Sequence, residues 1–158
     1  MRFLADHDKP NHKLRRRVVQ MIRDTNFGTE HKPDYGCFDV DDLSDGRFVA
    51  GLLGEFDVLL ACAVLKPQPF TIRSDKTRSD FLSGFCVDAA VRKGGLARIL
   101  HDHICADAKA RYPTATQHHI VLDAERHNWP FWVDKMGYIL LPDGCGSSSV
   151  SSFMRRTW

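Results

Sequence analysis

Hydrophobic residues along the chain alternate between a helical spacing and a strand-like spacing. Leu14, Val18 and Ile22 recur at intervals that place them on one helix face, and Gly28 is a natural end for that helix, which opens near residue 10. A longer helical pattern follows over 94–111, and a short one over 130–136. The predicted strands are 2–6, 48–53, 57–65, 81–87, 120–122, 138–141 and 150–158.

The order of these elements predicts an α/β fold with a mixed central sheet in a single domain, residues 1–158. A hairpin region of three strands precedes an alternation of strands and helices. Segments rich in Gly, Pro, Ser and Asp are expected to be loops at 28–46, 74–79 and 142–149, the first with one helical turn near Val40 to Leu43.

Composition narrows the class of partner. A net charge of +2 gives no reason to expect nucleic acid or a membrane as the main partner, and no apolar run approaches the roughly 18 to 20 residues of a membrane span. The five cysteines are odd in number and form no C-x-x-C pair, which favours reduced thiols. No signal-peptide pattern opens the chain. We expect a cytoplasmic protein.

The segment after the predicted strand 81–87 is the most informative. The strand enters a turn with two glycines, Gly94 and Gly95, and a long helix leaves it. The start of a helix carries roughly half a positive charge, and Arg92, Lys93 and Arg98 add full charges, so the turn suits a pyrophosphate. It matches neither the P-loop nor the G-x-G-x-x-G pattern. A Gly-Gly turn before a helix can also be a turn without a ligand.

Two motifs resemble the GNAT N-acetyltransferases. Residues 92–97, Arg-Lys-Gly-Gly-Leu-Ala, fit the family pattern [QR]-x-x-G-x-[GA], and residues 131–138 resemble the short helix that follows it in the family. The resemblance implies the GNAT fold, with a mixed sheet flanked by helices, and acetyl-CoA as cosubstrate. It places the pantetheine arm between two splayed strands, with the Val87 N–H polarising the thioester carbonyl. The implied acyl-CoA-binding residues are Phe85, Val87, Arg92, Lys93, Gly94, Gly95, Leu96, Ala97, Arg98 and Asn128.

This sequence differs from the family pattern at the positions that are expected to transfer protons. The position of the usual acid, a Tyr, is Val133, and the usual Asn is replaced by Arg126 with Asn128 two residues away. Tyr138 and Cys145 are possible substitutes for the acid, although each is typical of a structural residue.

Several residues could act as the base, and the sequence does not choose between them. Ser83 occupies the usual strand position and could hold a water, Asp80 lies three residues earlier, and His119 has a suitable ordinary pKa. The predicted catalytic set is therefore Ser83, Asp80, His119 and Tyr138. His101 and Cys105 have a helical spacing that could hold a metal, but no third ligand has a recognised spacing, so no metal is expected.

The leading hypothesis is transfer of an acetyl group from acetyl-CoA to a primary amine by direct attack. The acceptor could be a small molecule or a protein amine, at a site built by the first helix and the loops 28–46 and 144–149. The Asp residues in and beside these segments could attract a cationic amine, or could be solvated loop carboxylates. The alternatives are a non-catalytic CoA-binding or regulatory protein of the same fold, and an α/β binding domain without CoA. We expect a monomer or a homodimer.

Overall fold

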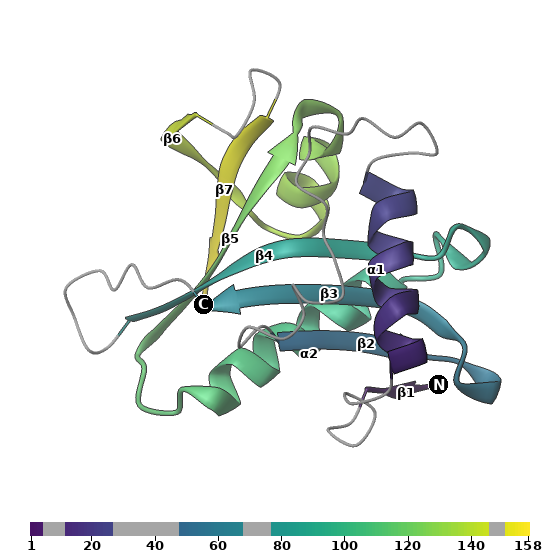
Figure 1. Cartoon of the computed structure of the whole chain (residues 1–158). Coiled ribbons are helices and arrows are strands. Elements are labelled where there is room, and N and C mark those ends of the chain that lie inside the picture. Colours follow the sequence, from purple (N-terminus) through teal and green to yellow (C-terminus); the bar gives the residue numbers. More distant parts are fainter. Residues whose placement is uncertain (5–11, 27–47, 68–76, 146–150) are drawn as a thin grey trace. The chain divides into compact units, whose positions relative to one another are not determined.

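The fold comes from a computed structural model that describes residues 1–4, 12–26, 48–67, 77–145 and 151–158 (Figure 1). Its elements, in chain order, are β1 (Arg2–Phe3), α1 (His12–Asn26), β2 (Phe48–Leu53), the 3₁₀ turn η3 (Glu55–Asp57), β3 (Leu59–Pro67), β4 (Thr77–Val87), the 3₁₀ turn η4 (Ala89–Val91), α2 (Leu96–Arg111), β5 (Gln117–Glu125), the 3₁₀ turn η5 (Arg126–Asn128), the π-helical turn η6 (Phe131–Lys135), β6 (Ile139–Cys145) and β7 (Ser151–Thr157).

The strands form one mixed sheet in the order β1-β2-β3-β4-β5-β7-β6. β4 and β5 pair in parallel from Thr77–Gln117 to Phe81–Val121, and β4 then continues to Val87. The β1–β2, β2–β3, β5–β7 and β6–β7 pairs are antiparallel. A parallel pair needs a crossover connection, and α2 supplies it. The sequence prediction of a mixed sheet flanked by helices is thus confirmed.

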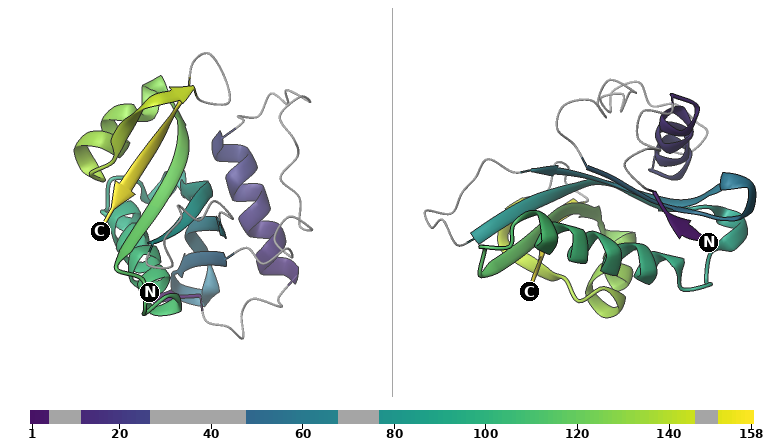
Figure 2. Two further views of the ribbon diagram at one scale, coloured as in Figure 1. Left: turned by 90° about the vertical axis from the view of Figure 1, so that its left-hand side faces the viewer. Right: turned by 90° about the horizontal axis from the view of Figure 1, so that it is seen from below.

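The chain divides into two compact units, and β3, β4 and α2 contribute to both. The first unit comprises residues 1–65 and 84–104. In it α1 lies on one side of β2 and β3, and the N-terminal part of α2 lies on the other side (Figure 2). The apolar face of α1 packs into a core whose buried members are Val18, Val19, Met21, Ile22, Leu53, Leu59, Cys62, Val64 and Cys86.

Gly84 determines how closely α1 can approach β4. A Cβ atom placed on Gly84 would lie 2.8 Å from Cδ1 of Ile22, closer than real Cβ contacts. Ile22 is almost fully buried, so its side chain has little room to move away. The absence of a side chain at residue 84 therefore lets the helix sit directly on the strand.

The second unit comprises residues 66–83 and 105–158. β5 and β7 pair along their lengths, from His119–Thr157 to Glu125–Ser151. The β5 side chains at even positions are buried, and with the other strands and η6 they form a core that includes Ile120, Leu122, Ala124, Met136, Tyr138 and Met154. The single-domain organisation stays a prediction.

Several element boundaries differ from the sequence prediction. Residues 77–79 and 142–145 were expected in loops but lie in β4 and β6. The expected strand 57–65 begins at Leu59, because Phe56 and Asp57 have left-handed backbones with φ of 55° and 56° that form the turn η3. The short helix expected at 130–136 is the π-helical turn η6. The expected loop 28–46 lies outside the described residues.

In the described part of the chain, no helix has both the length and the hydropathy that crossing a membrane would require.

Candidate functional site

Asp88 organises the connection from β4 to the turn that was expected to hold phosphate. Its carboxylate Oδ1 accepts a hydrogen bond from the Ala90 N–H at 2.9 Å, and its carbonyl accepts one from the Val91 N–H at 3.1 Å. Asp is among the residues that most favour such a capping position, because its short side chain reaches the first unpaired N–H groups. The chain therefore leaves the strand in one defined direction.

The turn itself contains two residues with left-handed backbones. Lys93 has φ 72° and Gly95 has φ 79°. The carbonyl of Gly95 accepts hydrogen bonds from the N–H groups of Arg98 and Ile99, at 3.0 and 3.2 Å, which begins the 16-residue helix α2. The backbone angle at residue 95 favours glycine, since an L-residue with that angle has a steric cost of about 1 to 2 kcal/mol.

Open space surrounds the start of α2. Arg92, Lys93, Gly94, Gly95 and Arg98 are exposed, and a Cβ atom placed on Gly95 would meet nothing within 4 Å. The first N–H groups of a helix and nearby cationic side chains together favour an anion. The structure thus brings together the residues that the sequence predicted as a pyrophosphate site.

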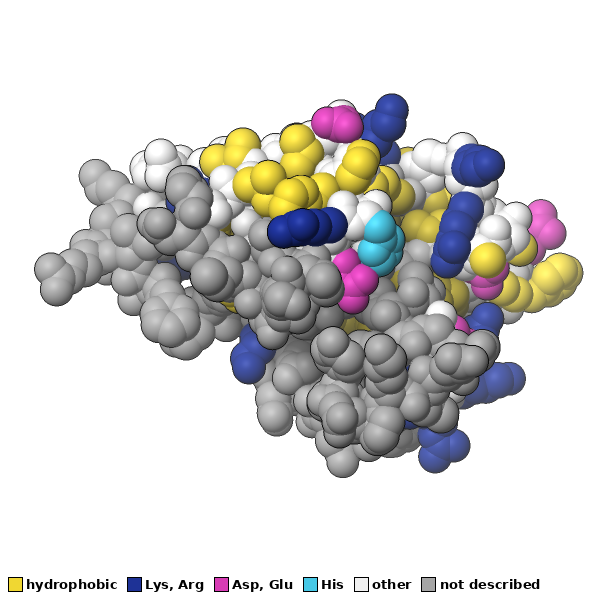
Figure 3. Space-filling model, turned by 90° about the horizontal axis from the view of Figure 1, so that it is seen from above, with side chains coloured by type: hydrophobic (Ala, Val, Ile, Leu, Met, Phe, Trp, Pro, Cys, Tyr) yellow, Lys and Arg dark blue, Asp and Glu magenta, His cyan; other side chains and the backbone are white. Residues whose placement is uncertain are grey.

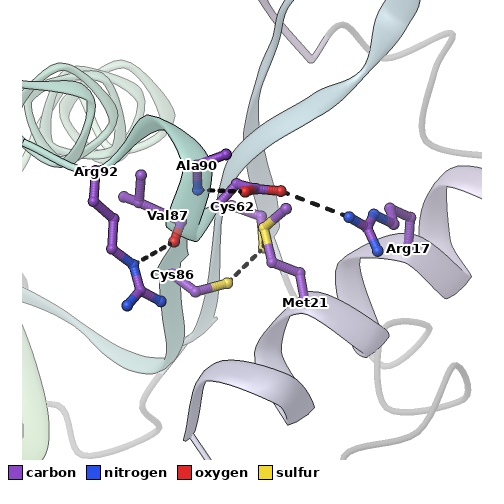
Figure 4. Close-up of polar contacts among 8 residues, drawn as sticks. Arg17, Met21, Cys62, Cys86, Val87, Ala90 and Arg92 are labelled. Carbon is purple, nitrogen blue, oxygen red and sulfur yellow. Dashed lines mark hydrogen bonds and ion pairs between the residues drawn. The ribbon is translucent and has the colours of Figure 1, made fainter. Parts of the chain in front are cut away.

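The peptide group that joins Val87 to Asp88 is held at both of its edges. The Nε–H of Arg92 donates to the Val87 carbonyl at 3.1 Å (Figure 4). The N–H of Asp88 donates to the carbonyl of Leu60 on β3 at 2.8 Å. Sequence analysis expected Arg92 to serve the phosphate. In the structure at least one of its donors instead fixes the end of β4, where Val87 is expected to polarise the thioester.

An ion pair connects this corner to α1. Nη2 of Arg17 lies 3.6 Å from Oδ2 of Asp88, and the two side chains are 51% and 28% exposed (Figure 4). At that exposure an ion pair contributes little to stability. Sequence reasoning missed both residues, although an Asp directly before Ala89–Val91 is a recognisable capping signal.

Asp80, one of the predicted bases, is committed to a buried ion pair. Its Oδ2 lies 3.4 Å from Nη2 of Arg111 at the end of α2, and Nε of Arg111 contacts Asp107 at 3.0 Å. Asp80 is 3% exposed. Burial raises the pKa of the Asp80 carboxyl, outweighing the lowering by Arg111. This arrangement is that of a structural pair. Ser83, the other candidate on β4, is half-buried.

His119 has the properties of a neutral imidazole near physiological pH. Its Nδ1 lies 2.7 Å from the hydroxyl of Thr157, its register partner on β7. Burial lowers the pKa of the His119 imidazole, and the charge of Arg155 lowers it further. A neutral imidazole can accept a proton, but His119 is only 6% exposed and its register partner on β4 is Ser79, eight residues before Val87.

Tyr138 lies deep in the core of the second unit. It is 1% exposed and makes an edge-to-face contact with Trp132, with ring centroids 5.2 Å apart. Burial strongly raises the pKa of its phenol. A phenol in that environment is a poor acid for a leaving thiolate, which favours a structural role.

Two further predicted positions are on the surface. Asn128 is exposed in η5. Val133 is 36% exposed in η6, and Ile139 and Leu140 of β6 are exposed as well. Hydrophobic side chains gather on one face of the molecule (Figure 3). The backbone of Cys145 lies in β6, and its side chain is outside the described residues. Within the described ranges no three His, Cys, Asp or Glu residues are placed to hold a metal ion.

Solved structures share this fold over nearly the whole chain. An aminoglycoside 6′-N-acetyltransferase complexed with coenzyme A aligns with a TM-score of 0.70 and 16% identity, covering 99% of this chain and 97% of that one. An acyl-CoA N-acyltransferase from Pseudomonas aeruginosa aligns at 0.65 and 19%, covering 99% of each chain. The aminoglycoside 6′-N-acetyltransferase from Enterococcus faecium aligns at 0.66 and 16%, covering 99% and 97%. The fold is that of the acyl-CoA N-acyltransferases.

The sequence narrows this class to one family. A model of the acetyltransferase (GNAT) family matches residues 15–138, and the chain belongs to that family. Both the family and the fold class inferred from the two sequence motifs are confirmed. No curated protein matches the chain in sequence.

Proposed function

We propose that the protein transfers the acetyl group of acetyl-CoA to a primary amine by direct attack of the amine on the thioester. The observation that carries this proposal is the exposed turn at the start of α2, with Gly95 left-handed and three basic side chains, Arg92, Lys93 and Arg98, close to it in sequence. Backbone N–H groups in such a turn, together with the helix start, suit the pyrophosphate of CoA. Family membership supports acetyl-CoA as the donor.

The proposed chemistry has separate requirements for the carbonyl and for the protons. The N–H of Val87 polarises the thioester carbonyl, and the fixed peptide between Val87 and Asp88 limits how far that strand end can turn. An alkylammonium with a pKa of about 10.4 must first lose a proton. His119 does not take it directly, because its register partner on β4 is Ser79, eight residues before Val87 and roughly 26 Å away along an extended strand. The leaving thiolate, with a pKa of about 8.5, needs no dedicated acid near neutral pH.

The acceptor is proposed by analogy with the relatives. Two of the structures compared above are aminoglycoside 6′-N-acetyltransferases, so small polyamines and aminoglycosides are the first acceptors to test. We further propose that the protein acts in the cytoplasm, as one domain, in monomeric or homodimeric form.

Calorimetry with CoA and acetyl-CoA tests the donor site. Three substitutions at Gly95 separate the possible causes of lost binding, since Ala adds only backbone strain, Gln adds length, and Glu adds length and negative charge. We expect Gly95→Glu to abolish binding and Gly95→Ala to retain it. Equal affinity for the Glu and Ala variants would show that the turn is not the phosphate site.

A second function, binding CoA without catalysis, is favoured by one observation. Val133 stands where the family commonly has Tyr, and the nearby Tyr138 is buried. Release of CoA thiol from acetyl-CoA, followed with a panel of aminoglycosides, polyamines and peptides, distinguishes the two functions. Tight CoA binding with no amine-dependent thiol release would favour the binding protein.

A further inference from the structure

Three sulfur-containing side chains meet in the core of the first unit. Sγ of Cys62 lies 3.2 Å from Sγ of Cys86 and 3.9 Å from Sδ of Met21 (Figure 4). The three residues come from β3, β4 and α1, and all are buried. Most buried cysteines fill space as small apolar groups. Here two thiols are already in contact.

β3 and β4 are neighbours in the sheet and run in opposite directions, and the contact between the two sulfurs places these cysteines opposite each other (Figure 1). The N–H of Asp88 donates to the carbonyl of Leu60 at 2.8 Å. Two residues forward along β3 from Leu60 is Cys62, and two residues back along β4 from Asp88 is Cys86. Opposed residues of antiparallel strands have Cα atoms about 4.5 to 5.5 Å apart, within the range of about 4.4 to 6.8 Å that a disulfide spans. A disulfide bond is about 2.05 Å long, so the sulfurs need to approach by only about 1.2 Å.

The reduced pair is protected under ordinary conditions. The hydrogen bond with Cys86 and burial both raise the pKa of the Cys62 thiol. Because the thiolate is the reactive form, oxidation should be slow at neutral pH and faster in alkaline solution. Because both sulfurs are buried, only a small oxidant can reach them.

We propose that Cys62 and Cys86 form a reversible dithiol–disulfide couple that responds to hydroperoxides. One sulfur attacks the peroxide and becomes a sulfenic acid, with release of one water; the second sulfur then displaces the hydroxyl, which leaves as another water. The two thiols lose two electrons and two protons in total, and hydrogen peroxide takes up both. A small dithiol returns the pair to the reduced state.

The position of the pair connects its oxidation to acetyl-CoA binding, and this connection rests on the proposed function. Cys86 stands between Phe85 and Val87, the two residues proposed to contact the acyl-CoA arm, and these lie on the opposite face of β4 from the buried cysteine. Drawing the sulfurs together pulls the backbone of β4 towards β3 at that point. Oxidised protein should therefore bind acetyl-CoA more weakly than reduced protein.

The test uses the full chain with Cys37→Ser, Cys105→Ser and Cys145→Ser, which leaves only the proposed pair. Hydrogen peroxide should lower the intact mass by about 2 Da, yield a crosslinked peptide containing residues 62 and 86, and do so faster at higher pH; dithiothreitol should reverse it. Adding Cys86→Ala provides the matched control, and Cys62→Ala replaces it if that variant does not fold by circular dichroism. A pair that stays reduced, gains oxygen instead, or crosslinks between molecules would overturn the proposal.

Calorimetry on the same preparations tests the link to acetyl-CoA. We expect the Kd to rise at least about threefold on oxidation and to return after reduction, because small displacements of positioning groups have large effects on recognition. An unchanged Kd in fully oxidised protein would overturn the link. Failure of the reduced protein to bind acetyl-CoA would count against the proposed function alone, since the mass measurement needs no ligand.

Discussion

Gly95 and Gly94 are adjacent, yet replacing each by alanine should have opposite effects on stability. Gly95 has φ 79°, and a Cβ atom there would meet nothing within 4 Å. The cost of Gly95→Ala is therefore backbone strain alone, about 1 to 2 kcal/mol for an L-residue with a left-handed backbone. Reduced freedom of the unfolded chain returns about 0.4 to 1 kcal/mol. The net destabilisation should be up to roughly 1.6 kcal/mol, or up to about 6 °C in Tm for a chain of this size.

Gly94→Ala is the matched control. Gly94 lacks a left-handed backbone, and its added Cβ would lie 3.4 Å from the Val91 carbonyl oxygen, an ordinary contact. This variant should be neutral or more stable by up to about 1 kcal/mol, because only the gain from the unfolded chain remains. Thermal unfolding of both variants, followed by circular dichroism without ligand, measures the difference. If Gly95→Ala were as stable as Gly94→Ala, the left-handed backbone at residue 95 would be refuted.

Three further predictions follow from single contacts. Gly84→Ala should destabilise the fold by about 1 to 3 kcal/mol through its 2.8 Å approach to Ile22, and Ile22→Val in the same chain should recover part of that loss in a double-mutant cycle. The raised pKa of Asp80 means that the folded state binds more protons than the unfolded state. The free energy of unfolding should therefore fall as pH rises from the ordinary carboxyl range through the raised pKa. Urea unfolding of Asp80→Asn at several pH values should lack this dependence. Val133→Tyr should fold normally, since residue 133 is 36% exposed, and should change kcat/KM for the best amine by less than about tenfold.

The parts of the fold that were predictable are those specified by neighbouring residues. The apolar face of α1 and the two-glycine turn are each determined by a short segment of sequence, and both are present in the structure. The sequence prediction was wrong where pairing with another strand determines the local conformation. Residues 142–145 include Pro, Asp and Gly, which favour loops, but Cys145 pairs with Ser152 of β7 and the segment is a strand. Local preference was overridden there by the partner strand.

The roles of individual polar residues were less predictable, for a related reason. Asp80 looks like a free carboxylate in the sequence, and its partner Arg111 lies 31 residues further along the chain. Nothing in the neighbourhood of Asp80 indicates that pairing. The same holds for Tyr138, whose phenol is available to chemistry only if it is not packed against Trp132. Burial and long-range pairing decide whether such a group can act, and a single sequence contains neither directly.

This contrast explains why the donor site and the proton-transfer groups differ in how well they could be inferred. The proposed CoA site uses contiguous backbone from Arg92 to Arg98, so its requirements for a turn, a left-handed glycine and a helix start are met within one segment. A base instead needs a partner that holds its side chain in place, as the Thr157 hydroxyl contacts His119 Nδ1 from 38 residues away. That contact joins the paired strands β5 and β7. The sequence does not show which side chain lies opposite each candidate on the neighbouring strand. Long-range pairing also shows where a candidate base does not reach the thioester: His119 pairs in register with Ser79, eight residues before Val87 on β4.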